Sequence, residues 1–95
     1  MSENTTKQNL GNISSNLKHI VGFLTNRNWL ILVPRIKKFI ENTKQIYDQT
    51  NVDKNQIIFK KFEELLAKNI DQKLAEDYLY FQTRFFNFST SSLFP

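Results

Sequence analysis

The sequence predicts an all-α protein, a small bundle of three to four helices formed by a single domain over residues 1–95. First, only two Gly and two Pro occur in the 95 residues, too few for the tight turns of a many-stranded fold. Second, apolar residues recur every three to four positions, the period of an amphipathic helix. Third, six aromatic residues fall within residues 78–88 without the strict alternation of a β-strand.

The first predicted helix covers about residues 6–24. Thr5 and Gln8 have the spacing of a capping box, which marks a helix start. Gly11 weakens the first turns, because Gly in a helix interior costs about 1 kcal/mol relative to Ala. We therefore expect the first turns of this helix to be loose. Its apolar face comprises Leu10, Ile13, Leu17, Ile20, Val21 and Leu24.

The second predicted helix covers about residues 34–47 and follows an Asn-rich break at residues 25–28. Pro34 sets its start, because Pro is tolerated in a first helical turn and disrupts a helix interior. A short turn over residues 29–33 would then precede the helix, and a helix kinked at Pro34 is the alternative. The inner face comprises Trp29, Leu32, Val33, Ile36, Phe39, Ile40, Thr43, Ile46 and Tyr47.

The third predicted helix covers about residues 54–68. Asp53 and Gln56 form a capping box, and Val52 and Ile57 have the spacing of a hydrophobic staple. The predicted inner face consists of Ile58, Phe62, Leu65, Leu66 and Ile70, with Phe59 at its edge.

The fourth predicted helix covers about residues 72–88, after a bend at residues 69–71 in which Asp71 caps the helix. One long helix through this bend is the alternative. The predicted apolar stripe is Leu74, Tyr78, Phe81, Phe85 and Phe88, opposite a wetter side with Lys73, Asp77, Tyr80 and Arg84. The polar ends, residues 1–5 and 89–95, are expected to be flexible.

No catalytic signature is present. The chain lacks Cys, and its only imidazole, His19, has no partner at a spacing typical of a general base. Adjacent acids such as Glu63 and Glu64 point about 100° apart on a helix, so they form no catalytic pair and are expected to be solvated. We therefore predict a non-enzymatic protein with no cofactor, metal or small-molecule substrate.

The longest apolar run also bears on location. It spans residues 29–33 and is far shorter than the roughly 20 residues that cross a bilayer, so no transmembrane segment is expected. The polar start lacks the apolar stretch of a signal peptide. These features predict an intracellular protein, in the cytoplasm or the nucleus.

Positive charge is concentrated in the first half of the chain. Residues 1–47 carry seven Lys and Arg against two acidic residues, whereas residues 48–95 carry six against seven. The candidate basic face of the second helix therefore comprises Arg35, Lys37, Lys38 and Lys44. It is either a solvated face or a binding surface for an acidic protein, nucleic acid or membrane.

The aromatic segment has two interpretations. Its rings at helical spacing fit a core, but a bundle of this size has a limited interior. Surplus aromatic residues on a small protein act as anchors of protein interfaces. The candidate partner-binding residues are therefore Leu79, Tyr80, Phe86 and Phe94.

The resulting functional hypothesis is a helical protein–protein interaction module. It would be a small subunit or adaptor, or a self-associating oligomer, with its contact on the aromatic C-terminal helix. One alternative is a small inhibitor or immunity-type protein, since the chain is similar in size and helical character to bacteriocin immunity proteins. Another is a nucleic-acid-binding domain that uses the basic face.

Overall fold

The structure, a computed structural model, describes the backbone of residues 3–91 and the side chains of residues 5–91. This part of the chain is helical and contains no strand, so the predicted all-α class is confirmed. A one-turn 3-10 helix, η1 (Gln72–Leu74), leads into the last of four α-helices, which are α1 (Glu3–Leu24), α2 (Val33–Gln49), α3 (Ile57–Ala67) and α4 (Ala75–Thr90).

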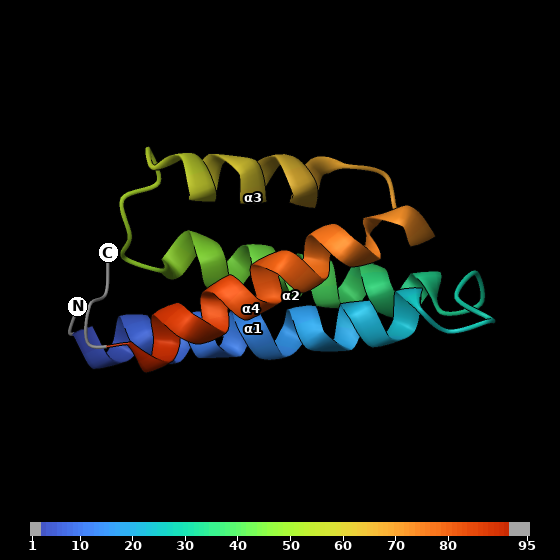
Figure 1. The fold of residues 1–95 in the computed structure, drawn as a ribbon, viewed down its shortest axis with the longest axis horizontal. Helices are drawn as coiled ribbons and strands as arrows, with labels where there is room; N and C mark the ends of the chain where they lie inside the picture. Colours follow the sequence, from blue (N-terminus) through green and yellow to red (C-terminus); the bar gives the residue numbers. More distant parts are fainter. Residues whose placement is uncertain (1–2, 92–95) are drawn as a thin grey trace.

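Successive helices run in opposite directions along an elongated bundle of 40 × 21 × 20 Å (Figure 1). α3 lies over α2 and α4, on the side away from α1. The connection between α1 and α2 projects beyond the helices at one end, and the α3–α4 connection lies at that same end. The two ends of the described chain meet at the opposite end of the bundle.

The most extensive helix contact joins α1 to α4, although they are the first and last helices of the chain. Small residues allow this approach: a Cβ on Gly11 would lie 3.6 Å from the Cβ of Ser89. The Ser14 hydroxyl donates to the carbonyl oxygen of Gln82 at 2.9 Å. The expectation of loose first turns is wrong, because α1 begins at Glu3 and Leu10 is fully buried.

Aromatic rings fill the space between α3 and the other helices. Phe62 lies at the centre of this cluster, with ring centroids 5.4 Å from Tyr47, 5.2 Å from Phe81 and 4.6 Å from Phe85. Phe59 was expected at the edge of the face but is fully buried. Because these rings are large, α3 stands further from its neighbours than α4 does from α1.

The remaining buried apolar side chains extend this cluster into one continuous core. Partly buried residues, including Trp29, Leu32 and Phe88, pack against its margin. α1 supplies Leu10, Ile13, Leu17, Ile20 and Leu24, α2 supplies Ile36 and Ile40, α3 supplies Leu65 and Leu66, and α4 supplies Tyr78.

The predicted start of the second helix is confirmed. α2 begins at Val33, with Pro34 in its first turn. Residues 25–32 form consecutive turns instead of a kinked continuation of the helix. Pro34 has this effect because its missing N–H falls where a helix has no internal acceptor.

The predicted start of the third helix is wrong. The Asp53 carboxylate accepts from the backbone N–H of Asn55 at 3.0 Å and so forms a local turn in place of a capping box. Gln56 has extended backbone angles, and α3 begins at Ile57, three residues later than expected. The hydrophobic staple is absent too, since Ile57 is 70% exposed.

The bend before the fourth helix is confirmed. α3 ends at Ala67, where Lys68 adopts an extended conformation. The Asp71 carboxylate then accepts from the N–H of Lys73 at 2.9 Å. It caps η1, whereas the helix predicted from residue 72 begins as α4 only at Ala75. Of the polar ends expected to be flexible, residues 3–5 and 89–90 belong to α1 and α4. Residues 1–2 and 92–95 lie outside the described part of the chain.

Candidate interaction surface

The aromatic helix α4 divides its large side chains between the core and the surface. Tyr78, Phe81 and Phe85 are buried. Leu79, Tyr80 and Phe86 remain 50%, 54% and 53% exposed, respectively. The fourth candidate residue, Phe94, lies outside the described residues. The helix is therefore both a core element and a source of exposed apolar surface.

The exposed residues of α4 do not form one patch. Leu79 and Phe86 are seven residues apart, so they lie within roughly 20° of each other around the helix axis. Exposed Thr83 lies between them, and we call Leu79 and Phe86 the apolar ridge. Tyr80 points about 100° away from Leu79, and its ring packs edge-on against Phe81 with centroids 5.2 Å apart.

A shallow groove of about 320 Å³ borders the apolar ridge between α1 and α4. Phe86 forms one of its edges and Lys18 supplies a cation. The other lining residues are small or polar: Gly11, Ser14, Ser15, Gln82 and Ser89. The groove exists because short side chains cover α1 here, leaving space above the point where the two helices approach. We call it the α1–α4 groove.

Tyr80 belongs to a different hollow, on the α3 side of α4. This hollow is about 270 Å³, and its charged lining residues are Lys61, Glu64, Lys68 and Asp77. Tyr80 and Phe86 are about 120° apart around the helix axis and line different hollows.

The basic candidates of α2 are exposed but are not gathered on one face. Lys37 and Lys44 are seven residues apart and lie on one line of the helix, and both line a hollow beside α3. Arg35 lies roughly 160° or more around the axis from both. Lys38 lies between these two edges, on the outward side of the helix. The predicted basic face is thus split across the width of α2.

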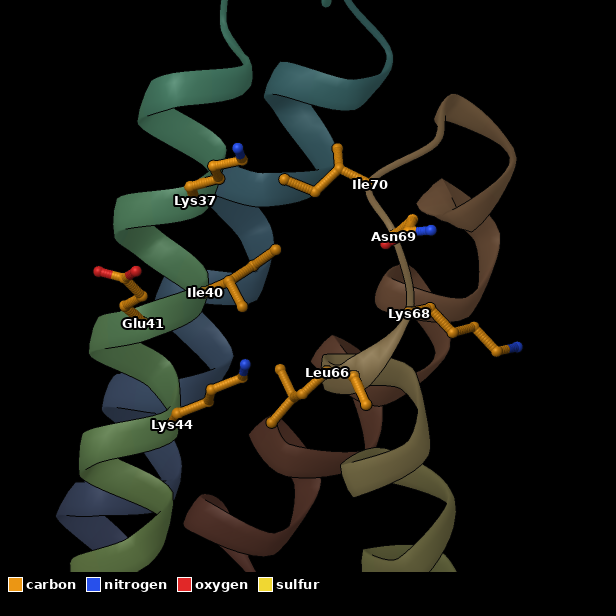
Figure 2. A pocket seen from close by; sticks show the side chains of 9 residues that line it. Lys37, Ile40, Glu41, Lys44, Leu66, Lys68, Asn69 and Ile70 are labelled. Atoms are coloured by element: carbon orange, nitrogen blue, oxygen red, sulfur yellow. The ribbon is translucent and has the colours of Figure 1, made fainter.

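Figure 2 shows the hollow that contains the two lysines. Lys37 and Lys44 extend from α2 toward α3, whereas Glu41 and Lys68 point away. Ile40, Leu66 and Ile70 form an apolar floor beneath a volume of about 220 Å³. Two exposed ammonium groups over an apolar floor give only weak attraction for an anion.

One partly buried polar contact connects α2 to α3. The Tyr47 hydroxyl donates to Glu63 Oε2 at 2.6 Å, and Tyr47 is only 3% exposed. Burial, the hydrogen bond and the negative charge of Glu63 all raise the pKa of Tyr47 above its usual value. From the sequence, Glu63 is expected to be solvated. The hydrogen bond between Tyr47 and Glu63 could not be predicted, because it depends on where α3 lies against α2.

The Tyr78 hydroxyl is a second buried phenol, and it has no hydrogen-bond partner among the described residues. Burial raises the pKa of Tyr78 to about 12. A phenol with a raised pKa and no neighbouring base is a poor nucleophile, so this position adds no catalytic chemistry.

The single imidazole is part of an aromatic surface cluster. The His19 ring centroid lies 5.1 Å from that of Phe39 and 6.4 Å from that of Phe23.

Within residues 5–91, no three His, Cys, Asp or Glu side chains are grouped as metal ligands. None of the described helices has the length and apolar character to span a membrane.

Two strongly exposed apolar residues were not predicted as surface candidates. Leu30 and Ile31, in the α1–α2 connection, are 69% and 77% exposed. The sequence did indicate this exposure. The periodicity that places Trp29, Leu32 and Val33 on the inner face leaves Leu30 and Ile31 off that face. The structure adds that the α1–α2 connection projects beyond the end of the bundle, where no helix covers it (Figure 1).

The chain matches no protein-family model, no curated protein and no solved structure.

Proposed function

We propose that this protein is a non-enzymatic helical interaction module that binds a partner protein through the apolar ridge and the adjoining α1–α4 groove. One observation carries the proposal: Leu79 and Phe86 stay half exposed on one line of α4, although the same helix buries three aromatic side chains. Bringing such side chains out of water is the main favourable term in protein association.

The shape of this surface suits a helix from the partner. A ridge beside a groove is the form into which the side-chain rows of a second helix pack. The small residues Gly11 and Ser15 in the groove would allow a close approach. Lys18 favours a partner that places an acidic residue opposite it. The partner is thus an amphipathic helix with an apolar stripe and an acidic flank.

A photo-crosslinking experiment tests the proposal. A photoreactive phenylalanine analogue replaces Thr83, between the two ridge residues, in the full chain expressed in its native cell. The matched control carries the analogue at Gln45, an exposed position on the outer side of α2. A partner specific to position 83 should be identified by mass spectrometry and then purified.

Binding of the purified partner then measures the ridge directly. Phe86→Ala should weaken binding by about 2 kcal/mol, roughly thirtyfold, the size expected of an interface anchor. Tyr80→Ala, on the other side of α4, is the matched control and should leave binding nearly unchanged. Equal affinity of wild type and Phe86→Ala, or crosslinking that is the same at positions 83 and 45, would refute the proposal.

The inhibitor or immunity-type alternative uses the same surface and differs only in the partner, which would be a toxin or its receptor. For this alternative, cells that carry Phe86→Ala should grow more poorly than wild-type cells only when that toxin is present. The nucleic-acid alternative has less support from the geometry, because Arg35 lies far around α2 from Lys37 and Lys44. Two neighbouring lysines give only a shallow dependence of affinity on salt.

A further inference from the structure

The connection between α1 and α2 carries a second apolar surface, distant from the apolar ridge. We call Leu30 and Ile31 the apolar tip. They are adjacent in sequence, are 69% and 77% exposed, and belong to the loop that projects from the end of the bundle (Figure 1). Neither lines the grooves and hollows described above.

The fold holds the apolar tip in this exposed position. Backbone hydrogen bonds run from Trp29 N–H to Asn26 O at 3.1 Å and from Ile31 N–H to Asn28 O at 3.0 Å. Trp29 and Leu32, on either side of the tip, pack against the core. The loop therefore anchors its flanking residues inward and presents Leu30 and Ile31 outward.

The surroundings of the tip are basic. The sequence has no Asp or Glu between Glu3 and Glu41. Four cations lie close to the tip in the sequence: Arg27, Arg35, Lys37 and Lys38. The α3–α4 connection reaches the same end, where Thr25, Lys73 and Glu76 line a common hollow. This connection and the start of α4 add about as many acidic residues as Lys, so the excess of positive charge comes from Arg27, Arg35, Lys37 and Lys38.

We propose that the apolar tip docks the protein on an anionic lipid surface. Leu30 and Ile31 would enter the boundary between headgroups and acyl chains, while Arg27 and Arg35 contact lipid phosphates. A small apolar insertion combined with a basic patch supplies the two contributions that reversible membrane binding requires.

The shape of the tip favours lipid over a protein partner. A stable protein interface buries about 800 Å² on each side and relies on complementary packing. Two side chains on a convex loop provide far less area than that. A fluid lipid surface adapts to a small protrusion, and its negative charge complements the surrounding Arg and Lys residues.

Vesicle flotation with the full chain tests this inference. Vesicles of phosphatidylcholine alone are compared with vesicles that also contain phosphatidylserine, at low and high salt. Wild-type protein should float only with the anionic vesicles, and more weakly as salt rises. The single Trp, Trp29, adjoins the tip. Its fluorescence should therefore shift to shorter wavelength and be quenched by brominated acyl chains.

Variants separate the apolar and electrostatic contributions. Leu30→Ser with Ile31→Ser should reduce the partition coefficient about tenfold or more, because it removes the inserted side chains. Arg27→Gln with Arg35→Gln should reduce it about tenfold and flatten its salt dependence. The matched control, Leu79→Ser with Phe86→Ser, changes the same number of exposed apolar residues and should bind vesicles like wild type. Circular dichroism verifies that each variant keeps its helices.

Three results would overturn the inference. One is the absence of anionic-vesicle binding by folded wild type at low salt. Another is unchanged binding by the Leu30→Ser, Ile31→Ser variant. The third is concentration-dependent self-association that this variant loses while vesicles have no effect, which would assign the tip to a second copy of the chain. None of these results bears on the apolar ridge, whose test uses Phe86→Ala and a purified protein partner.

Discussion

The two buried tyrosines differ in how their hydroxyl groups are satisfied. Tyr47 donates to Glu63 at 2.6 Å, whereas the Tyr78 hydroxyl has no partner among the described residues. A buried polar group without a hydrogen bond costs about 1–3 kcal/mol, while a made bond contributes about 1 kcal/mol. The two phenols therefore affect stability in opposite directions.

Removing the Tyr78 hydroxyl should stabilise the protein. Tyr78→Phe keeps the buried ring and eliminates the unsatisfied group, so we expect the free energy of unfolding to rise by about 1 kcal/mol. Urea denaturation of wild type and variant measures this change. A decrease in stability would show that the hydroxyl makes a favourable contact.

Removing the Tyr47 hydroxyl should have the opposite effect. Tyr47→Phe breaks the bond to Glu63 between α2 and α3, and we expect a loss of about 1 kcal/mol, because the exposed carboxylate regains water. A double-mutant cycle with Glu63→Ala, which removes the acceptor, isolates the coupling between the two side chains. Additive effects would mean that the bond contributes nothing to stability.

Stability should also fall in strongly alkaline solution. Burial raises the Tyr78 pKa from 10.0 to about 12 in the folded protein. Between these pH values the unfolded chain has released the phenol proton and the folded chain still holds it. Rising pH therefore favours unfolding, by about 1.4 kcal/mol per pH unit for this proton. Urea denaturation at pH values across this window should show a smaller slope for Tyr78→Phe than for wild type.

The shortest helix, α3, depends on its packing. Its 11 residues are fewer than an isolated helix needs in water. Its central ring, Phe62, contacts aromatic rings of both α2 and α4. The stability of α3 is therefore a property of the aromatic cluster.

Phe62→Ala should consequently destabilise the whole protein by about 3–5 kcal/mol, the range for removing a buried Phe. Hydrogen exchange should show that the amides of α3 lose protection first, because the helix loses its central contact. Phe86→Ala is the matched control at a half-exposed position and should change stability by less than about 1 kcal/mol. Equal losses for the two variants would contradict the assigned positions of these rings.

The helix boundaries show what local sequence can predict. Pro34 placed the start of α2 correctly, because its covalent structure restricts it to the first turn whatever surrounds it. The pattern of Asp53 and Gln56 misplaced the start of α3 by three residues. The Asp53 carboxylate has several backbone N–H groups within reach, and it bonds the one two residues ahead.

The ridge on the side of α4 and the tip in the α1–α2 connection are separate apolar surfaces of the described part of the bundle. We expect them to act independently. Leu79→Ser with Phe86→Ser should weaken binding of the protein partner and leave vesicle binding intact, and Leu30→Ser with Ile31→Ser should do the reverse. Salt should weaken vesicle binding markedly and partner binding less, because Lys18 is the one charged residue that lines the groove beside the ridge. A single pair of substitutions that abolishes both activities would indicate one shared surface.

The sequence by itself determined the all-α class, the order of the helices, the boundary at Pro34 and most of the buried residues. These follow from the 3.6-residue period and from the geometry of Pro, which are local properties of the chain. Periodicity gives the direction of a side chain around the axis of its own helix.

Only the tertiary structure decided which flanks of each helix are covered. The sequence placed Phe59 at the edge of its face and left open whether Phe86 belongs to the core or to the surface, and the packing buries Phe59 and leaves Phe86 half exposed. Whether a flank is buried depends on where the neighbouring helices lie, and that position is set by contacts between residues far apart in the chain.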